Sequence, residues 1–272
     1  MKVLVTGANG FLGRSVVKQL RSAGNDTIGT ARQEAAGLVR VDLGQPDAVW
    51  ALMKSSRPTA IVNCAAVVDF GPGALGRQWP VNTMAPGLLA QWCAQEGAHL
   101  IHASTIAVHG RTITQIDDTT PVNSDTDYAR SKLLAEDLIR ASNCRSTIIR
   151  FPGLFGRNGP THLGINNAIR CAHENQIPTI IGRGSGRRNY LFVEDAAAII
   201  EHCISQDLTG LFWAGGSQSL SIREMMGSIC DVLLPGRTPN HVDGYEARDQ
   251  LVCHSPELPI GRGFREALAA EA

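Results

Sequence analysis

Short apolar runs alternate with segments of helical spacing through the first 150 residues of the chain. The segment 2–6 is apolar and β-branched, which is typical of a buried strand. The segment 11–23 has apolar residues at helical spacing, and Gly24 follows where a helix would end. The same alternation predicts strands at 27–30, 37–41, 60–66, 99–104 and 147–151, and helices at 47–56, 86–96 and 127–142.

Strands that alternate with helices favour βαβ units, so we predict an α/β, Rossmann-type doubly wound parallel sheet. After Gly156 the alternation weakens, although 192–205 predicts a strand end with a helix and 222–234 predicts another helix. We therefore expect a dinucleotide-binding domain at 1–158, to which 188–205 returns. A small C-terminal substrate-binding lobe would comprise 159–187 and 206–272.

Composition limits the classes of partner. The 25 basic and 25 acidic residues balance, so bulk charge favours neither nucleic acid nor an anionic membrane surface. The apolar runs are far shorter than a membrane span. The seven cysteines are spread singly, which predicts neither a disulfide framework nor a metal site. Because the first residues also lack the pattern of an export signal, we expect a cytoplasmic protein.

A glycine-rich loop, 7–13, lies between the first predicted strand and the first predicted helix. Its spacing is G-x-x-G-x-x-G, in place of the G-x-G-x-x-G of the standard dinucleotide fingerprint. Glycines here permit a tight turn, close backbone approach to a pyrophosphate, and contact between helix and strand. The free N–H groups of the helix N-terminus attract phosphate. The loop therefore predicts a dinucleotide site.

The end of the second predicted strand favours NADP over NAD. A carboxylate at this point binds the ribose hydroxyls of NAD, whereas an arginine accommodates the 2′-phosphate of NADP. The sequence here is Thr30-Ala31-Arg32. We therefore expect Arg32 to contact the 2′-phosphate of NADPH, with NAD kept as the alternative cofactor.

Tyr128 and Lys132 lie four residues apart at the start of a predicted helix, so both face the same side. A tyrosine with its ordinary pKa near 10 is a poor acid or base near neutrality, and an adjacent ammonium lowers that pKa. Thr105 comes directly after another strand, at the sheet edge where the cofactor crevice is expected. We predict Thr105, Tyr128 and Lys132 as the catalytic residues.

These elements, in this order, resemble the extended short-chain dehydrogenase/reductase family, which includes sugar-nucleotide epimerases, dehydratases and 4-ketoreductases. The resemblance extends from Lys2 to about Ile200. The matching motifs are the glycine loop, Asp42-Leu43, Asn63-Cys64-Ala65-Ala66, Val81-Asn82, Ser104 to Gly110, Tyr128 with Lys132, Arg150 to Gly156, and Arg188 to Asp195. Two positions depart from the family: His109 replaces the usual tyrosine, and Gly153 replaces a frequent asparagine.

The resemblance implies a set of binding residues. Those expected at the cofactor are Gly7, Asn9, Gly10, Phe11, Leu12, Gly13, Arg32, Asp42, Leu43, Ala65, Ala66, Asn82, Tyr128, Lys132 and Phe151. Those expected at the substrate are Thr105, Asn166 and Arg188. Arg188 would hold a diphosphate, a task suited to the planar guanidinium fork, within the glycine- and arginine-rich segment 182–190.

The two residues after Thr105 narrow the choice of reaction. Family dehydratases have an Asp-Glu pair there and enzymes that epimerise C3 or C5 have another acid/base group, whereas this chain has Ile106 and Ala107, which transfer no protons. Arg32 then favours a sugar-nucleotide 4-ketoreductase of the dTDP-4-dehydrorhamnose reductase type. Three alternatives stay open: a nucleotide-sugar 4-epimerase with bound NAD, a reductase of a non-sugar ketone, and a non-enzymatic NADP-binding sensor.

The predicted helices 86–96 and 127–142 resemble those that pair into a four-helix dimer interface in this family. The second helix has Leu133, Leu134, Leu138 and Ile139, more apolar surface than one core face requires. We therefore predict a homodimer.

Overall fold

Seven strands form the main sheet of the protein. The computed structural model describes residues 1–271, and in it the strand order is β12-β7-β5-β4-β1-β2-β3. The bounds are β1 (Lys2–Thr6), β2 (Asp26–Ala31), β3 (Val39–Arg40), β4 (Ala60–Asn63), β5 (His99–Thr105), β7 (Ser146–Phe151) and β12 (Gly210–Trp213). This is the Rossmann-type parallel sheet that the sequence predicted.

The register of the sheet places the strand ends that build the site. β1 pairs in parallel with β2 on one side and with β4 on the other, and β4 pairs in parallel with β5. Val3, Leu4 and Val5 of β1 are fully buried, as expected for a central strand covered on both faces. The chain reverses its direction of strand addition between β1 and β4, which is where doubly wound sheets form ligand crevices.

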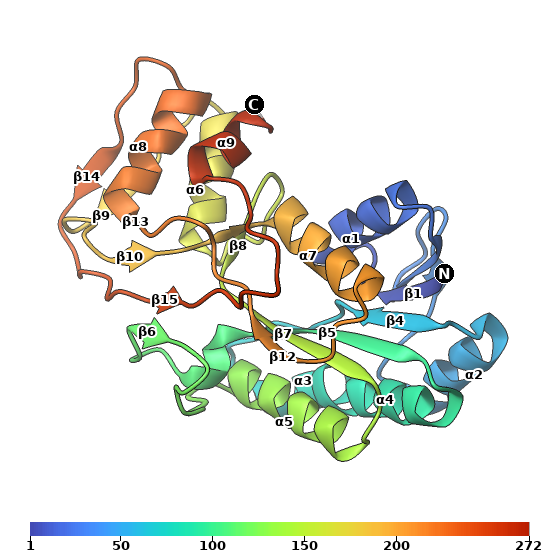
Figure 1. Cartoon of the computed structure of the whole chain (residues 1–272). Helices are drawn as coiled ribbons and strands as arrows, with labels where there is room; N and C mark the ends of the chain where they lie inside the picture. Colours follow the sequence, from blue (N-terminus) through green and yellow to red (C-terminus); the bar gives the residue numbers. More distant parts are fainter. Residues whose placement is uncertain (272) are drawn as a thin grey trace. The chain divides into compact units, whose positions relative to one another are not determined.

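Helices cover both faces of this sheet (Figure 1). The helices that follow the strands of the first 150 residues are α1 (Phe11–Ser22), α2 (Pro46–Ser56), α3 (Ala74–Trp79), α4 (Ala85–Glu96) and α5 (Asp127–Ala141). Figure 1 shows α4 and α5 side by side on one face, and α7 (Val193–Ser205) returns beside the sheet on the other. The predicted helices at 11–23, 47–56, 86–96 and 127–142 are confirmed to within a residue or two.

One helical segment of this region was not predicted from the sequence. α3 continues through a π-helical turn, η1 (Pro80–Met84), directly into α4. Pro80 is the first residue of this turn and Pro86 is the second residue of α4, so both prolines lie where the helical geometry changes.

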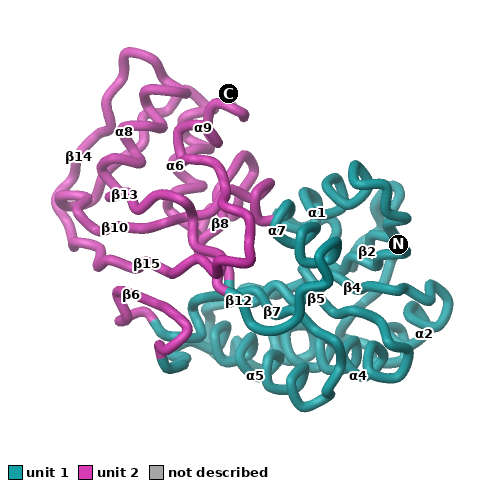
Figure 2. Tube along the Cα trace, viewed as in Figure 1, with its two compact units in different colours: residues 1–110, 121–150, 197–212 teal, residues 111–120, 151–196, 213–272 magenta. Residues whose placement is uncertain are grey.

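Two compact units divide the chain (Figure 2). The first contains residues 1–110, 121–150 and 197–212, and the second contains 111–120, 151–196 and 213–271 of the described chain. The boundaries differ from the predicted domains, because 151–158 and 188–196 belong to the second unit and 206–212 to the first. The excursion 111–120 joins the second unit through β6 (Gln115–Ile116), which pairs with β15 (Leu251–Val252).

The second unit consists of short paired strands and helices. Its paired strands are β8 (Leu154–Phe155) with β11 (Leu191–Phe192), β9 (Thr179–Ile181) with β14 (Asn240–Val242), and β10 (Arg187–Arg188) with β13 (Leu220–Ser221). Its helices are α6 (Gly164–His173), α8 (Ile222–Leu233) and α9 (Phe264–Ala269). Only α8 and the Phe192–Val193 junction were predicted. No helix within residues 1–271 combines the length and apolar character that a membrane crossing requires.

Candidate active site

The glycine loop has the backbone geometry that a phosphate site needs. Gly7 has φ +66°, and it lies so close to β4 that a Cβ on it would be 2.8 Å from the Cα of Ala65. Gly10 is the N-cap of α1, and its amide donates to the Gly7 carbonyl at 2.9 Å. A Cβ on Gly13 would lie 2.1 Å from that same carbonyl oxygen. Each glycine is therefore required by contact or conformation.

A pocket of about 350 Å³ opens beside this loop, at the carboxyl ends of β1, β2, β3 and β4. Its lining residues are Gly7, Asn9, Gly10, Thr30, Ala31, Arg32, Val41, Asp42, Leu43, Cys64, Ala65, Ala66, Val67 and Val81. Eight of these were predicted as cofactor contacts from the sequence. The site thus lies at the switch point of the sheet, where the fold places dinucleotides in doubly wound proteins.

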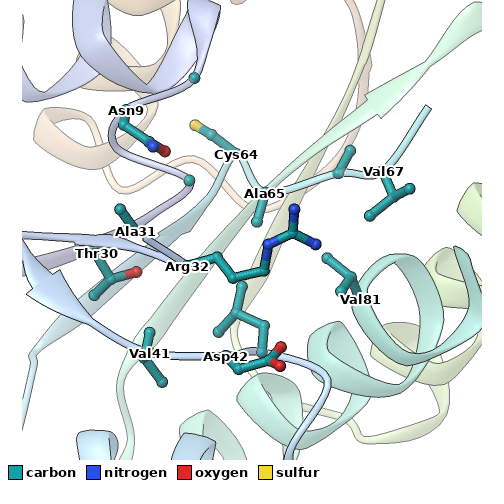
Figure 3. A pocket seen from close by; sticks show the side chains of 14 residues that line it. Asn9, Thr30, Ala31, Arg32, Val41, Asp42, Cys64, Ala65, Val67 and Val81 are labelled. Atoms are coloured by element: carbon teal, nitrogen blue, oxygen red, sulfur yellow. The ribbon is translucent and has the colours of Figure 1, made fainter. Parts of the chain in front are cut away.

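Arg32 projects into this pocket from the end of β2, and Asp42 lies on the segment after β3 (Figure 3). The Arg32 side chain is exposed, so it stays hydrated until a ligand arrives. Cys64 also lines the pocket, and burial raises the pKa of its thiol to about 12 despite the charge of Lys132. The cysteine is therefore a neutral, unreactive wall of the pocket near neutral pH.

Asn82 shapes the pocket from behind. It is fully buried, its Oδ1 accepts from the Val67 amide at 2.7 Å, and its Nδ2 donates to the Val67 carbonyl and to Ser131 Oγ at 2.8 and 3.0 Å. Asn82 itself does not line the pocket, but Val67, to which it bonds, and the adjacent Val81 do. Six further predicted cofactor residues lie outside the lining: Phe11, Leu12 and Gly13 at the start of α1, Tyr128 and Lys132 on α5, and the buried Phe151 at the end of β7.

Tyr128 and Lys132 occupy the first turns of α5, as the spacing predicted. Thr126 caps this helix, with its Oγ1 accepting from the Ala129 amide at 3.2 Å. Tyr128 is half-buried, and this burial raises the pKa of its phenol to about 12. In the protein without ligands, the tyrosine is thus held in the protonated form that a general acid must start from.

Lys132 is almost completely buried, which is rare for a lysine. Burial lowers the pKa of its ammonium to about 8, while the carboxylate of Glu136 and the Cys64 thiol oppose that shift. Its Nζ lies 3.1 Å from Nε2 of His102 on β5. A lysine whose charge changes near neutral pH, one turn from a tyrosine, is a functional-site feature.

Thr105 is the last residue of β5, and its Oγ1 accepts from the Ala107 amide at 3.1 Å. The preceding Ser104 donates to Glu136 at 2.5 Å, and Arg150 donates to both oxygens of the same carboxylate at 3.1 and 2.7 Å. Burial works to raise the pKa of Glu136, but these donors and the charge of Arg150 hold it below its ordinary value. The buried carboxylate therefore fixes the loop that presents Thr105.

His109, which replaces a family tyrosine, belongs to this same network. Its Nε2 lies 3.0 Å from Nη1 of Arg150, and its Nδ1 lies 3.1 Å from the Pro121 carbonyl oxygen. Because a guanidinium only donates, Nε2 accepts and Nδ1 carries the proton. The neutral ring thus connects Arg150 to the backbone of the segment after the 3₁₀ turn Ile106–His109.

The predicted substrate residue Arg188 lies in the second unit, on β10. It lines a small pocket with Tyr190, Ser217, Gln218, Leu220, Met225, Arg262 and Phe264. Its Nη1 donates to the carbonyls of Arg187 and Arg248. Arg262 and Tyr190 were not predicted as site residues. The backbone amide and the guanidinium of Arg262 donate to the carboxylate of Asp195, the last residue of the Arg188–Asp195 motif, at 2.7 and 2.8 Å.

Asn166, the third predicted substrate residue, lies in the second unit. It is buried in α6, its Oδ1 accepts from the Gly156 amide at 3.2 Å, and its Nδ2 donates to the Leu154 carbonyl at 3.0 Å. This geometry makes it a support for the loop after β8. The glycine at position 153, where the family often has asparagine, is explained by close packing, since a Cβ there would lie 2.4 Å from the ring of Tyr190. An asparagine at this position would displace that ring.

Comparisons with known proteins agree with this architecture. The NAD dependent epimerase/dehydratase family matches residues 3–210, so the chain belongs to that family. It is 34% identical over 164 residues, or 57% of its length, to methionine adenosyltransferase 2 subunit beta of Mus musculus, of which 47% is covered. It is 28% identical over 223 residues to a dTDP-4-dehydrorhamnose reductase of Burkholderia thailandensis, with 79% and 71% of the two chains covered.

Solved structures share the fold across the whole chain. A dTDP-4-dehydrorhamnose reductase from Bacillus anthracis, solved in complex with NADP, has a TM-score of 0.84 and 20% identity and covers 100% of this chain and 99% of its own. The sequence match to the mouse protein spans about half of that relative's length. Among residues 1–271, no group of three or more histidine, cysteine or acidic side chains is placed to hold a metal ion.

Proposed function

We propose that this protein is an NADPH-dependent reductase of the keto group of a nucleotide-linked 4-keto-deoxysugar. The observation that supports it most directly is the half-buried Tyr128 one helical turn before the buried Lys132, in the unit that also contains the dinucleotide pocket. The relatives named as 4-ketoreductases support the same reaction class.

Bound NADPH supplies the hydride that adds to the carbonyl carbon of the ketone. In this mechanism the carbonyl oxygen lies between the Tyr128 hydroxyl and Thr105, and Tyr128 donates the proton that converts the developing alkoxide to an alcohol. Lys132 stabilises the resulting phenolate and thereby lowers the pKa of Tyr128 from the raised value of the ligand-free protein. Thr105 keeps the oxygen oriented, since its strand end is fixed through Ser104 and Glu136.

NADPH is proposed over NADH because the end of β2 presents Arg32 to the pocket. Asp42, after β3, is available to the ribose and adenine side of the same ligand. A guanidinium favours the additional phosphate of NADP through charge and hydrogen bonds. The related reductase solved with NADP supports this choice.

Reduction is favoured over dehydration by the residues after Thr105. Ile106 is buried and Ala107 has only a methyl group, so neither can protonate a leaving hydroxyl. We propose Arg188 as the residue that binds the substrate diphosphate in the second unit, with Tyr190 and Arg262 beside it. A nucleotide-sugar 4-epimerase would use the same catalytic pair with a retained NAD, which Arg32 disfavours.

A homodimer is proposed on the exposed face of α5. Leu134 and Leu138 are 37% and 41% exposed there, and Leu138 contacts α4, since a Cβ on Gly87 would lie 3.1 Å from it. This exposed apolar surface on α5, beside α4, supports the dimer that the family resemblance suggested. Light scattering with size exclusion would show twice the mass of 29.1 kDa; the monomer mass at micromolar concentration would contradict the dimer.

A second candidate is a subunit that binds the dinucleotide without turning it over. The relative with 34% identity is named as a subunit of a methionine adenosyltransferase, and it supports this alternative. Turnover distinguishes the two. The test incubates the protein with NADPH and dTDP-4-dehydrorhamnose and follows the loss of NADPH absorbance, with NADH and with UDP-glucose plus NAD⁺ as parallel reactions. NADPH-dependent turnover is expected; tight NADPH binding without consumption would favour the subunit.

A further inference from the structure

A chain of four buried polar side chains connects the catalytic lysine to the centre of the sheet. Lys132 Nζ lies 3.1 Å from His102 Nε2, and His102 Nδ1 lies 3.0 Å from the Asn63 side-chain nitrogen. Thr6 donates its hydroxyl proton to Asn63 Oδ1 at 2.5 Å. All four side chains are at most 1% exposed, and they come from α5, β5, β4 and β1.

His102 is neutral in this position. Burial and the adjacent charge of Lys132 lower the pKa of its imidazole well below the ordinary value. A neutral imidazole has one N–H donor and one lone-pair acceptor, on opposite ring nitrogens. The nitrogen that faces Lys132 therefore either accepts or donates, and the nitrogen that faces Asn63 does the opposite.

Asn63 can match either orientation of the ring. In the arrangement that the structure shows, its amide nitrogen donates to His102 Nδ1, so Nε2 has the proton and points it at Lys132. If the amide rotates by half a turn, its oxygen accepts from Nδ1–H and its nitrogen faces Thr6 Oγ1, which can accept. His102 Nε2 then accepts a hydrogen bond from Lys132.

We propose that His102 is a positioning residue for Lys132, which holds the lysine nitrogen in one place in both of its charge states. The ring accepts at Nε2 when Lys132 is an ammonium, and donates from Nε2 when Lys132 is an amine. Asn63 and Thr6 adjust with it. The device is built from the chain's own residues, and only its consequence for turnover rests on the proposed function.

The adaptable hydrogen bond of His102 matters because Lys132 changes its charge near neutral pH. The groups that face Lys132 are Glu136 on α5, Cys64 after β4 and His102 on β5; burial outweighs Glu136 and lowers the lysine pKa to about 8. A buried amine or ammonium without a partner is costly, so an adaptable neighbour keeps the Lys132 nitrogen beside His102 in either state.

Nitrogen NMR of the ligand-free protein tests the proposal without any substrate. Two-bond proton–nitrogen correlations report the tautomer of each histidine ring, and His102→Gln assigns the signal. Between about pH 6 and about pH 10, His102 is expected to change from the Nδ1–H to the Nε2–H tautomer without becoming charged, with a midpoint near the lysine pKa of about 8. Lys132→Met should abolish the change.

His99 is the matched internal control. It is an equally buried histidine on the same strand, its Nε2 contacts Thr147 Oγ1 at 2.7 Å, and burial lowers its pKa to about 4. Its tautomer should therefore stay constant over the whole range. A His102 tautomer that is also constant, or one that changes equally in Lys132→Met, would overturn the proposal.

Variants of His102 give a second, kinetic test. His102→Leu offers neither donor nor acceptor, so the buried lysine should lose its proton more easily and the alkaline limb of the kcat profile should move to lower pH. His102→Gln, whose amide offers both groups, should stay close to the parent profile, and His99→Leu should not move it. A His102→Leu profile unchanged in position, with only a lower Tm, would assign a merely structural role. Should the parent show no turnover, the proposed function fails while the NMR result still decides this inference.

Discussion

The two pockets of this protein differ in what builds them. The pocket of the first unit holds about 350 Å³ and is formed mainly by backbone and small side chains at four adjacent strand ends. The pocket of the second unit holds about 10 Å³ and is formed by long side chains, several of which already bond within the unit. The first is thus a consequence of sheet topology, whereas the second depends on side chains from loops and two-residue strands.

This difference parallels a division of tasks, in which the first unit would bind the cofactor and the second would select the substrate. The strand ends and the glycine loop are held by backbone contacts, and the pocket between them is open without a ligand, which suits the dinucleotide that the family binds. In the second unit, Arg188 donates to the carbonyls of Arg187 and Arg248 in the absence of ligand. A substrate phosphate at Arg188, as proposed above, would therefore compete with these hydrogen bonds.

Removal of one buried carboxylate should affect the first unit most. In Glu136→Gln, the buried guanidinium of Arg150 loses its anionic partner, whereas the exposed Arg140 keeps Asp137. We expect the free energy of unfolding to fall by about 3–5 kcal/mol, measured from urea unfolding. The control in the second unit is Glu174→Gln, whose pair with Arg170 is exposed and should contribute at most about 1 kcal/mol. Equal effects of the two changes would contradict the structural role of the buried Glu136 carboxylate.

Arg188→Ala should separate the two pockets functionally. We expect KM for the best nucleotide sugar to rise by an amount equivalent to about 2–4 kcal/mol, with NADPH affinity unchanged. Arg170→Ala, on the exposed side of α6, is the control. If KM stays constant in Arg188→Ala, the substrate has no diphosphate at this residue, and a non-sugar ketone becomes the better candidate.

A pair of glycine-to-alanine changes compares the backbone of the two units. Gly13→Ala places a Cβ against the Gly7 carbonyl, so we expect a loss of about 1–3 kcal/mol in stability and a loss of NADPH binding. Gly227→Ala in α8 meets nothing within 4 Å and should stabilise the protein by about 0.5–1 kcal/mol. Thermal unfolding and fluorescence titration measure both; intact NADPH binding in Gly13→Ala would show that the loop tolerates movement.

Arg32→Ala should have the smallest effect, because the residue is exposed and screened. We expect NADPH affinity to fall about tenfold, or about 1.4 kcal/mol, while NADH affinity stays constant. Arg57→Ala, at the exposed end of α2, serves as the control. A parallel loss for both cofactors would exclude the 2′-phosphate as the partner of Arg32.

The sequence predicted the first unit far better than the second, for physical reasons. β1, α1 and α5 have long periodic patterns that local residues determine, and the predicted helix 127–142 matches α5 within one residue. β10 and β13 are two residues long and pair across more than thirty positions, so no local pattern specifies them. α6 was missed although its buried Ile165, Ala168, Ile169 and Ala172 have helical spacing.

The site follows the same rule. The glycine loop and the Tyr128–Lys132 pair could be predicted because each has a fixed spacing over a few neighbouring residues. Arg262 and His102 were missed because their partners, Asp195 and Lys132, are distant in sequence and only the fold brings them together. Asn82 and Asn166 were predicted as ligand contacts, and in the structure the side chains of both form hydrogen bonds with the backbone.

Turnover of Tyr128→Phe tests the central claim most directly. Phenylalanine keeps the ring and loses only the hydroxyl, so NADPH affinity should be unchanged while kcat falls by about 10²–10⁴-fold. Tyr245→Phe, a fully exposed tyrosine in the second unit, is the matched control and should leave both quantities unchanged. A Tyr128→Phe protein that reduces its substrate within about threefold of the parent rate would contradict the assignment of Tyr128 as the acid.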